Sequence, residues 1–186
     1  VMRGEDIDPY EQVLETSDGE PVWIEVNPTR AVIGGEDRFV AISRDVTERK
    51  RREREYEQIF NGVKDPIAVF DPETGEITEV NGPYREMIGY DDLEMIRELG
   101  IEGLSAGERY TGERGAELIR EVIDTGDAKT VEWEVETASG DRRYLDITLS
   151  PAVIRGEERV LTIQRDVTER KRREQEYEQI FNSVQD

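Results

Sequence analysis

The sequence predicts an α+β domain in which helices cover one face of a five-stranded antiparallel sheet. Two short apolar runs separated by a turn begin the pattern, an amphipathic helix follows, and three strands with alternating apolar residues complete it. A second observation is that the three strands, and the charged segment after them, occur twice within the 186 residues. We therefore expect one complete unit and part of another, each followed by a linker helix.

The first two strands of the complete unit are expected to form a hairpin. The apolar runs PIAVF and ITEV flank the segment Asp71–Gly75, whose Asp, Pro, Thr and Gly residues favour a turn. Asn81 is then placed to cap a short helix over residues 84–90. A longer helix is predicted over Glu113–Asp124, because its apolar residues gather on one broad face, and Gly126 ends it.

Three strands follow in which apolar and polar residues alternate. This alternation is typical of antiparallel strands that have one dry face and one wet face. A turn at 139–141 separates the first two strands, and Gly156 precedes the third. The residues expected on the dry face are Val131, Trp133, Val135, Leu145, Ile147, Leu149, Leu161 and Ile163.

An internal repeat sets the expected domain organisation. The segment RDVTERKRREREYEQIFN begins at Arg44 and returns with one substitution at Arg165, 121 positions later (165 − 44 = 121). The same offset aligns the strands upstream of both copies, and the sequence leaves open how the first, incomplete set packs. We expect four parts: C-terminal strands of a preceding unit at 1–47, a connector helix at 48–60, the complete unit at 61–168, and a C-terminal connector or coiled-coil helix at 169–186.

The composition is strongly acidic, with 45 acidic and 25 basic residues and a net charge of −20. A surface of this sign repels phosphate backbones, so nucleic acid is not an expected partner in spite of the RKRR clusters. Such a composition is typical of proteins adapted to concentrated salt, where screening removes the self-repulsion. We therefore expect a halophilic source, and the alternative is an ordinary acidic protein.

Histidine and cysteine are both absent from the sequence. This excludes disulfides, thiol nucleophiles, imidazole bases and the usual zinc sites, so neither an enzymatic role nor a metal site is expected. Apolar runs stay well short of the about 18 residues that cross a bilayer. The segment is therefore expected to make no membrane contact and to lie in the cytoplasm.

Three stretches resemble the PAS sensor family in order and spacing: DPIAVFDPETGEITEVNGPYREMIGY from Asp65, VEWEVETASGDRRYLDITLSPAVI from Val131, and RDVTERKRRE from Arg165. The resemblance covers about Gln58 to Lys171, and residues 1–50 resemble the three C-terminal strands of that fold. It implies a signal-input module in a tandem sensor protein of a prokaryote, a haloarchaeon by its composition. Its expected partners are neighbouring PAS domains and an output domain, a histidine kinase or transducer, which would hold any kinase activity.

The resemblance also sets expectations about cofactors. Haem in such domains takes an axial ligand that is usually histidine, while flavin photosensors and cinnamate-type receptors of this fold use a cysteine. Because the chain has neither residue, haem, cysteinyl flavin and thioester chromophores are not expected. A non-covalent small aromatic metabolite remains as a ligand class, and non-covalent flavin has no positive support. The alternative is a ligand-free dimerisation or protein-interaction module.

A candidate ligand pocket lies between the dry face of the sheet and the helices, with a flat compound held between Trp133 and Met87 or Tyr84. The alternative is that these residues only pack against one another as a core. The candidate lining residues are Val69, Val80, Tyr84, Met87, Ile88, Ile119, Val131, Trp133, Leu145 and Ile147.

Each linker helix begins at an Asp-x-Thr motif, which the resemblance associates with the helices that join PAS domains. The motif comprises Asp45 and Thr47 in the first copy and Asp166 and Thr168 in the second. The aspartate is placed to cap the helix, with a glutamate three residues later completing a capping box. Because this arrangement would fix the last strand to the first helical turn, these four residues are candidates for signal relay.

The linker helix also carries a heptad pattern. Tyr177 and Phe181 of the second copy lie on this seam and are further relay candidates. Two seam positions are charged, so we expect a weak parallel homodimer whose helices slip or rotate to pass a signal. The alternative is a monomeric spacer held straight by charge pairs four residues apart. In the first copy the seam consists of Val46, Arg49, Glu53, Tyr56, Phe60 and Val63.

Overall fold

The computed structural model describes residues 8–107 and 109–183. The chain divides into two compact units, Val1–Ile59 and Phe60–Asp186. The boundary falls inside helix α1 (Thr47–Gly62), whose last residues therefore belong to the second unit.

The second unit contains a five-stranded sheet in which every neighbouring pair of strands is antiparallel. The strand order is β5-β4-β8-β7-β6, so the last strand of the unit lies at the centre of the sheet. This arrangement confirms the predicted fold class. The strands are β4 (Ile67–Phe70), β5 (Ile77–Val80), β6 (Lys129–Glu136), β7 (Arg142–Ile154) and β8 (Glu157–Asp166).

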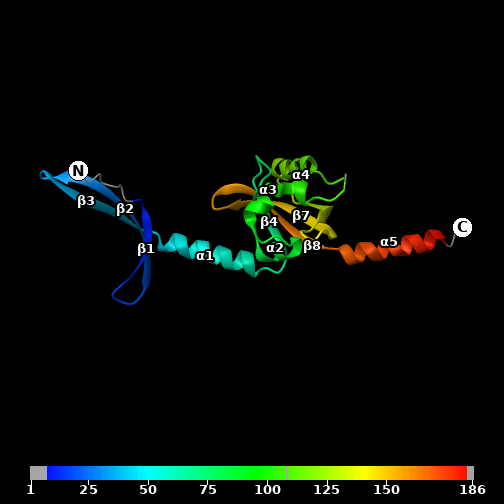
Figure 1. Cartoon of the computed structure of the whole chain (residues 1–186), viewed down its shortest axis with the longest axis horizontal. Helices are drawn as coiled ribbons and strands as arrows, with labels where there is room; N and C mark the ends of the chain where they lie inside the picture. The colour runs from blue at the N-terminus through cyan, green and yellow to red at the C-terminus, as the bar shows by residue number, and fades with distance from the viewer. Residues whose placement is uncertain (1–7, 108, 184–186) are drawn as a thin grey trace. The chain divides into compact units, whose positions relative to one another are not determined.

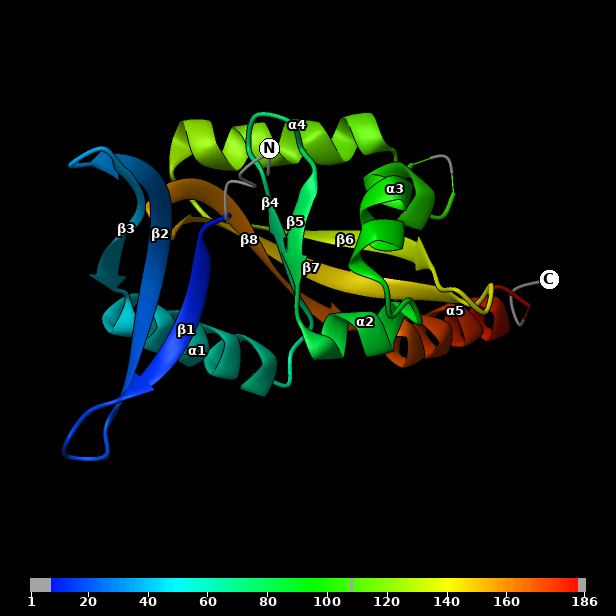
Figure 2. The same cartoon turned by 60° about the vertical axis from the view of Figure 1, so that its left-hand side comes forward.

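Helices α2 (Gly82–Ile88), α3 (Leu93–Leu104) and α4 (Gly112–Thr125) belong to the same unit, with α3 and α4 on one face of the sheet (Figures 1 and 2). Helix α5 (Thr168–Ser183) leaves from the end of β8. Of these helices, the sequence analysis did not place α3. It is kinked at Gly100, where φ is 58°, so its apolar pattern does not run through the whole segment.

Local sequence accounts for where these elements begin and end. The turn between β4 and β5 forms because the Asp71 carboxylate accepts two backbone N–H groups and Gly75 takes a φ of 73°. The hydroxyl of Thr111 caps α4 by accepting the N–H of Arg114. Gly126 then ends that helix in the left-handed conformation, as predicted.

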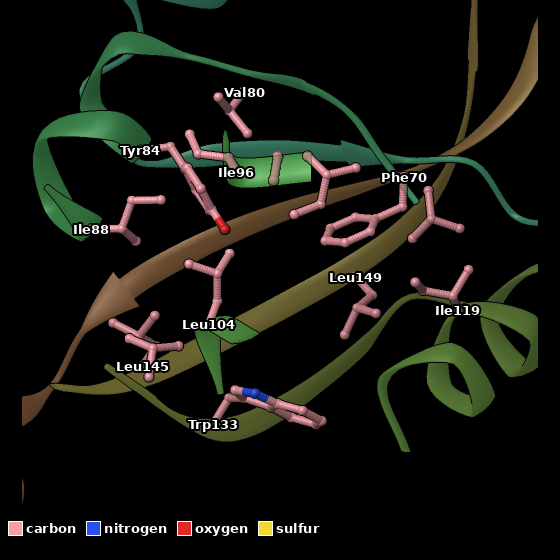
Figure 3. Packing of buried hydrophobic residues seen from close by; sticks show 14 of the residues in the cluster. Phe70, Val80, Tyr84, Ile88, Ile96, Leu104, Ile119, Trp133, Leu145 and Leu149 are labelled. Carbon is pink, nitrogen blue, oxygen red and sulfur yellow. The ribbon is translucent and has the colours of Figure 1, made fainter. Parts of the chain in front are cut away.

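The core of the second unit lies between the helices and the inner face of the sheet (Figure 3). Ile88, Ile96 and Ile119 reach it from the three helices, while Leu145 and Val160 reach it from the sheet. Burial of each such side chain stabilises the fold by about 1.5–3 kcal/mol before the entropy cost of ordering it.

The predicted facing of β8 is wrong. Antiparallel pairing places Thr162 opposite Leu149, so Thr162 shares the inner face with its buried partner, and Gln164 follows two residues later. Leu161 and Ile163 therefore point to the outer face, where Ile163 is 42% exposed. Because β8 is a central strand with apolar residues on both faces, hydrophobicity alone did not reveal which of its alternating residues face the core.

Val69 of β4 is also on the outer face. It pairs with Leu161, whereas Ala68 and Phe70 turn toward the core. The prediction that Val69 lines the pocket is therefore wrong, although the residue is buried.

The first unit contains a three-stranded antiparallel sheet of β1 (Tyr10–Glu15), β2 (Pro21–Ile33) and β3 (Glu36–Asp45), followed by α1. Its register repeats that of β6, β7 and β8 at the offset of 121 residues. Leu14 and Phe39 are 46% and 65% exposed, whereas the residues at the same positions of the second unit are buried in the core. Among the described residues of the first unit, this face of the sheet therefore has no helical cover.

Candidate functional site

The junction between β8 and α5 is fixed by three hydrogen bonds. The Asp166 carboxylate accepts the backbone N–H of Thr168 at 2.9 Å, and the Thr168 hydroxyl accepts the N–H of Tyr144 in β7 at 2.9 Å. Val167 donates its N–H to the carbonyl of Tyr144 at 2.8 Å. The first residues of α5 are thus bonded to two adjacent strands, and no loop intervenes between sheet and helix.

The junction between β3 and α1 repeats this geometry. The Asp45 carboxylate accepts the N–H of Thr47 at 2.9 Å, the Thr47 hydroxyl accepts the N–H of Trp23 at 2.9 Å, and Val46 donates to the carbonyl of Trp23 at 2.9 Å. Hydrogen bonds from the Thr47 side chain and backbone lower the pKa of the Asp45 carboxyl. The same motif therefore builds the same joint in both units.

The predicted capping box is wrong. Each helix begins at its threonine, so the aspartate stands before the capping position and binds the N–H two residues ahead. The glutamate of the proposed box turns away along the helix: Glu169 pairs with Arg173 at 3.1 Å, and Glu48 pairs with Arg52 at 3.2 Å.

Ion pairs surround each junction. Lys171 lies 2.6 Å from Glu132 of β6, and this hydrogen bond raises the pKa of the lysine. Arg170 lies 3.1 Å from Asp146 of β7. In the first unit Lys50 lies 2.5 Å from Glu11 of β1. Because these pairs are exposed to solvent, they contribute little to stability and orient the helix more than they stabilise it.

The predicted seam residues differ in accessibility. Tyr177 on α5 is 72% exposed, whereas Phe60 on α1 is buried within the second unit. Val46 and Val167, the first seam positions, are buried at their junctions. The side chain of Phe181 lies outside the described part of the structure.

A cavity of about 70 Å³ lies in the core between the sheet and helices α3 and α4. Of the ten residues proposed for a ligand site, Val69 faces the other side of the sheet, and Val80, Met87, Ile88 and Leu145 are buried in the core without lining this cavity. The cavity therefore does not support the proposed contact between Met87 and a ligand. The other five line the cavity: Tyr84, Ile119, Val131, Trp133 and Ile147.

Two short polar chains reach the cavity wall. Trp133 donates its indole N–H to the Ser105 hydroxyl at 2.9 Å, and that hydroxyl donates to the Ile101 carbonyl at 2.6 Å. The Tyr84 hydroxyl extends from α2 toward the sheet (Figure 3). There it interacts with the side chain of Gln164, which also lines the cavity. Burial raises the pKa of Tyr84 to about 12, so the phenol is neutral at physiological pH.

The sequence analysis missed four polar or small lining residues: Ser105, Gly115, Thr162 and Gln164. Thr162 and Gln164 interrupt an apolar run in the last strand, which was the one available signal. Ser105 follows the unplaced helix α3, and Gly115 reveals its role only through its close approach to Ile101.

Metal binding has no candidate group among the residues that the structure describes. Within the same ranges, none of the helices combines the length and apolar character needed to cross a bilayer.

Comparison with known proteins identifies the fold. The PAS domain family model matches residues 2–48 and 64–169. No curated protein matches the chain. Among solved structures, the chain is similar to the PAS domain of an HTR-like protein from Haloarcula marismortui, with 22% identity and a TM-score of 0.51 over 63% of this chain and 98% of that one.

Two further structures give comparable values. A PAS domain from Colwellia psychrerythraea shares 22% identity and a TM-score of 0.51, over 63% of this chain and 98% of that one. A domain of a sensory box sensor histidine kinase/response regulator from Geobacter sulfurreducens shares 22% identity and a TM-score of 0.50, over 65% of this chain and 99% of that one. At this identity, similarity to these structures shows only the fold, whereas the family model covers most of the sequence. The chain therefore belongs to the PAS domain family.

Proposed function

We propose that this chain is an input-and-relay module of a signalling protein, in which a change in the sheet of the PAS domain is passed to the helix that follows. The observation that carries the proposal is the bonded junction from Asp166 to Thr168. It occurs in both units, with hydrogen-bond partners at equivalent positions of the sheet. A strand bonded to a helix in this way transmits a displacement that a flexible loop would absorb.

The second part of the proposal is that α5 acts as one half of a parallel homodimer. Tyr177 supports it, because a tyrosine that is 72% exposed on a helix offers apolar area to a partner. Arg170 and Glu174, the two charged seam positions before it, keep such a contact weak. Weak packing permits two arrangements of similar energy, as a relay requires.

Cysteine cross-linking tests the dimer, because the chain has no cysteine of its own. Tyr177→Cys places a thiol on the seam, whereas Arg172→Cys places one on the opposite side of the same helix. Under mild oxidation we expect disulfide-linked dimers of the first variant and few of the second. Equal cross-linking of both, or monomers at every concentration in sedimentation with neighbouring domains attached, would contradict the proposal.

The input itself is proposed to be a small molecule that enters the cavity between the sheet and α3 and α4. The apolar wall with two polar chains supports a compound with an apolar body and one polar group. At about 70 Å³ the cavity is smaller than the roughly 150 Å³ that admits benzene in an apolar protein core. A flat aromatic metabolite would therefore require α3 or α4 to move outward.

The small cavity also favours the second candidate function, a ligand-free dimerisation and relay module. Indole and benzoate serve as probes to separate the two. A ligand-binding domain should show a rise in melting temperature and a change in the emission of Trp133, recorded in a Trp23→Phe background. Leu149→Phe, which fills the cavity, should abolish both effects. If wild-type protein responds to neither probe nor to a wider set of aromatic metabolites, the result favours the ligand-free dimerisation and relay module.

We place the output in neighbouring domains of the same protein, a kinase or a transducer, and propose no catalytic step for this chain. Support comes from the sequence, which has neither a histidine to accept a phosphoryl group nor a glycine-rich phosphate-binding loop. In the full protein, Thr168→Val should weaken the response of the output domain without removing its basal activity.

A further inference from the structure

Asn81 stands between β5 and α2, and its side chain is fully buried. The amide uses its two ends on different parts of the chain. Its Oδ1 accepts the N–H of Ile67 at 2.9 Å and the N–H of Tyr84 at 3.0 Å. Its Nδ2 donates to the carbonyls of Phe60 at 3.1 Å and Asp65 at 2.9 Å.

The oxygen thus serves the first strand and the first helix after the hairpin, whereas the nitrogen serves the last turn of α1 and the loop that leads out of it. An asparagine amide offers two donors and one oxygen that accepts two bonds, so every bonding position of Asn81 is used. A fifth hydrogen bond also ties the end of α1 to the domain, because Gly82 donates its N–H to Asn61 Oδ1 at 3.1 Å. These five hydrogen bonds hold the end of α1 on the domain, and most of them are out of contact with water. We call this set of bonds the seat of α1.

This seat is linked to the cavity. Tyr84, whose N–H is bound by Asn81, lines the cavity together with Gln164, and its hydroxyl interacts with the Gln164 side chain. Gln164 lies two residues before Asp166, the first residue of the junction with α5. One side chain of α2 and the last three residues of β8 thus connect the end of the incoming helix with the start of the outgoing helix.

We infer that Asn81 is a positioning residue that couples the seat of α1 to the wall of the cavity, and through β8 to the start of α5. The inference deepens the relay function proposed above and rests on it. When the nitrogen-side bonds are made, Tyr84 is held in place and its hydroxyl stays beside Gln164. When they open, the first turn of α2 is released on the side that faces the cavity. Coupling of this kind acts in both directions, so a change at Tyr84 loosens the end of α1 in turn.

The variant Asn81→Asp separates the two ends of the amide. It keeps an oxygen for Ile67 and Tyr84 but replaces the donor nitrogen by a second oxygen, which faces two carbonyl groups. We expect backbone amides of residues 60–65 to exchange hydrogen about tenfold faster or more, while those of Leu145 and Val160 keep the wild-type rate. The side-chain amide resonances of Gln164 should shift in the same variant.

Asn61→Ala is the matched control, because it removes the acceptor of the Gly82 N–H while leaving all four Asn81 bonds in place. It should loosen the last turn of α1 without shifting the Gln164 resonances. If Asn81→Asp accelerates exchange uniformly, Leu145 and Val160 included, the residue has only a general structural role and the inference fails. It also fails if residues 60–65 exchange at the wild-type rate or if the Gln164 signals stay in place. None of these outcomes bears on the dimer, which the Tyr177→Cys cross-link decides separately.

Wild-type protein provides a second test that does not depend on the variant folding. The side-chain amide protons of Asn81 should exchange together with the backbone amides of the last turn of α1, with the same dependence on low concentrations of denaturant. If they exchange only with global unfolding, as Leu145 and Val160 are expected to do, the seat does not open as a separate step and the inference is overturned.

Discussion

Thr168 serves two elements at once, since its N–H is bound by Asp166 while its hydroxyl accepts the N–H of Tyr144. It is also nearly buried, so water cannot easily replace either partner. The first residue of the helix is thus also the residue that binds the helix to both strands of the junction. At this scale the proposed relay depends on single atoms, and single-atom changes can test it.

Replacing Thr168 by valine keeps the shape of the side chain but removes the acceptor oxygen. The N–H of Tyr144 would then be left partly buried without its partner, which costs about 1–3 kcal/mol of the free energy of unfolding. Urea denaturation followed by circular dichroism measures this change. Thr130→Val is the matched control, because its hydroxyl bonds to Thr148 on an exposed face, and it should cost less than about 0.5 kcal/mol. Equal losses in the two variants would show that the hydrogen bond at the junction contributes no more to the free energy of unfolding than an exposed one.

Tyr84 gives the domain a dependence on alkaline pH. Burial raises its pKa to about 12 in the folded protein, whereas an unfolded tyrosine titrates near 10. Between these values the unfolded chain has lost the proton that the folded chain retains, so stability falls as pH rises above about 10. We expect a loss on the order of 2 kcal/mol by pH 12 from this one group.

The comparison with Tyr84→Phe isolates the effect. That variant lacks the ionisable group but shares every other titration, so the difference in stability between wild type and variant should shrink as pH rises from 8 to 11. Denaturant titrations at these pH values provide the measurement. A difference that stays constant with pH would mean that the phenol is not held neutral in the folded state.

Residues whose role is set by near neighbours could be predicted from the sequence. Asp45, Thr47, Asp166 and Thr168 were found in this way, because the bond from the threonine N–H to the aspartate carboxylate spans only two positions. The bonds from the threonine hydroxyl to a strand 24 positions away were not predicted. The capping box failed on a shift of one residue, since the helix begins at the threonine and not at the valine that directly follows the aspartate. Gln164 could not be placed from its neighbours, because the pairing of β8 with β7 decides which face it takes.

At the scale of the element, α3 and α4 pack closely against each other at Gly115. A Cβ atom added at Gly115 of α4 would stand 2.7 Å from Cγ2 and 2.9 Å from Cδ1 of Ile101 on α3. The absence of a side chain at this position therefore sets how closely the two helices pack, and with it one wall of the cavity.

We expect Gly115→Ala to destabilise the domain by about 1 kcal/mol, because overpacking outweighs the gain of roughly 1 kcal/mol that alanine brings to an open helix. In an Ile101→Ala background the obstacle is gone, so the same substitution should become stabilising. A double-mutant cycle of unfolding free energies measures the reversal of sign. If Gly115→Ala is stabilising in both backgrounds, the close packing of α3 and α4 is not a constraint.

Elements with an unbroken period were predicted well, and those interrupted or buried on both faces were not. The hairpin β4–β5, the helices α2 and α4, and strands β6 and β7 lie where the apolar pattern placed them. Helix α3 was missed because Gly100 divides it into two pieces, each too short to show a helical period. The phase of β8 was missed because a central strand has apolar residues on both faces.

At the scale of the whole molecule, the net charge of −20 predicts a strong dependence of stability on salt. At about 0.1 M salt, charges within roughly 10 Å of each other still interact, whereas at 1 M the range falls to about 3 Å. The excess acidic groups repel one another, and the exposed ion pairs contribute too little to offset this. We expect the melting temperature to rise between 0.1 and 2 M KCl.

Calorimetry across this range of KCl checks the expectation. A variant in which several exposed glutamates are replaced by glutamine provides the control, because a smaller net charge should reduce the slope. A melting temperature that falls with salt would mean that the exposed ion pairs, such as Glu132 with Lys171, contribute more to stability than the repulsion removes.

The bonding of Asn81 has a chemical consequence for the lifetime of the protein. Asparagine followed by glycine is the sequence most prone to deamidation, in which the next backbone nitrogen attacks the side-chain amide and releases ammonia. Here that nitrogen, of Gly82, is engaged by Asn61, and the amide under attack is held at both ends. Asn61 is itself followed by glycine and lies exposed, so it should deamidate first. Asn81 should stay intact for as long as its hydrogen bonds hold.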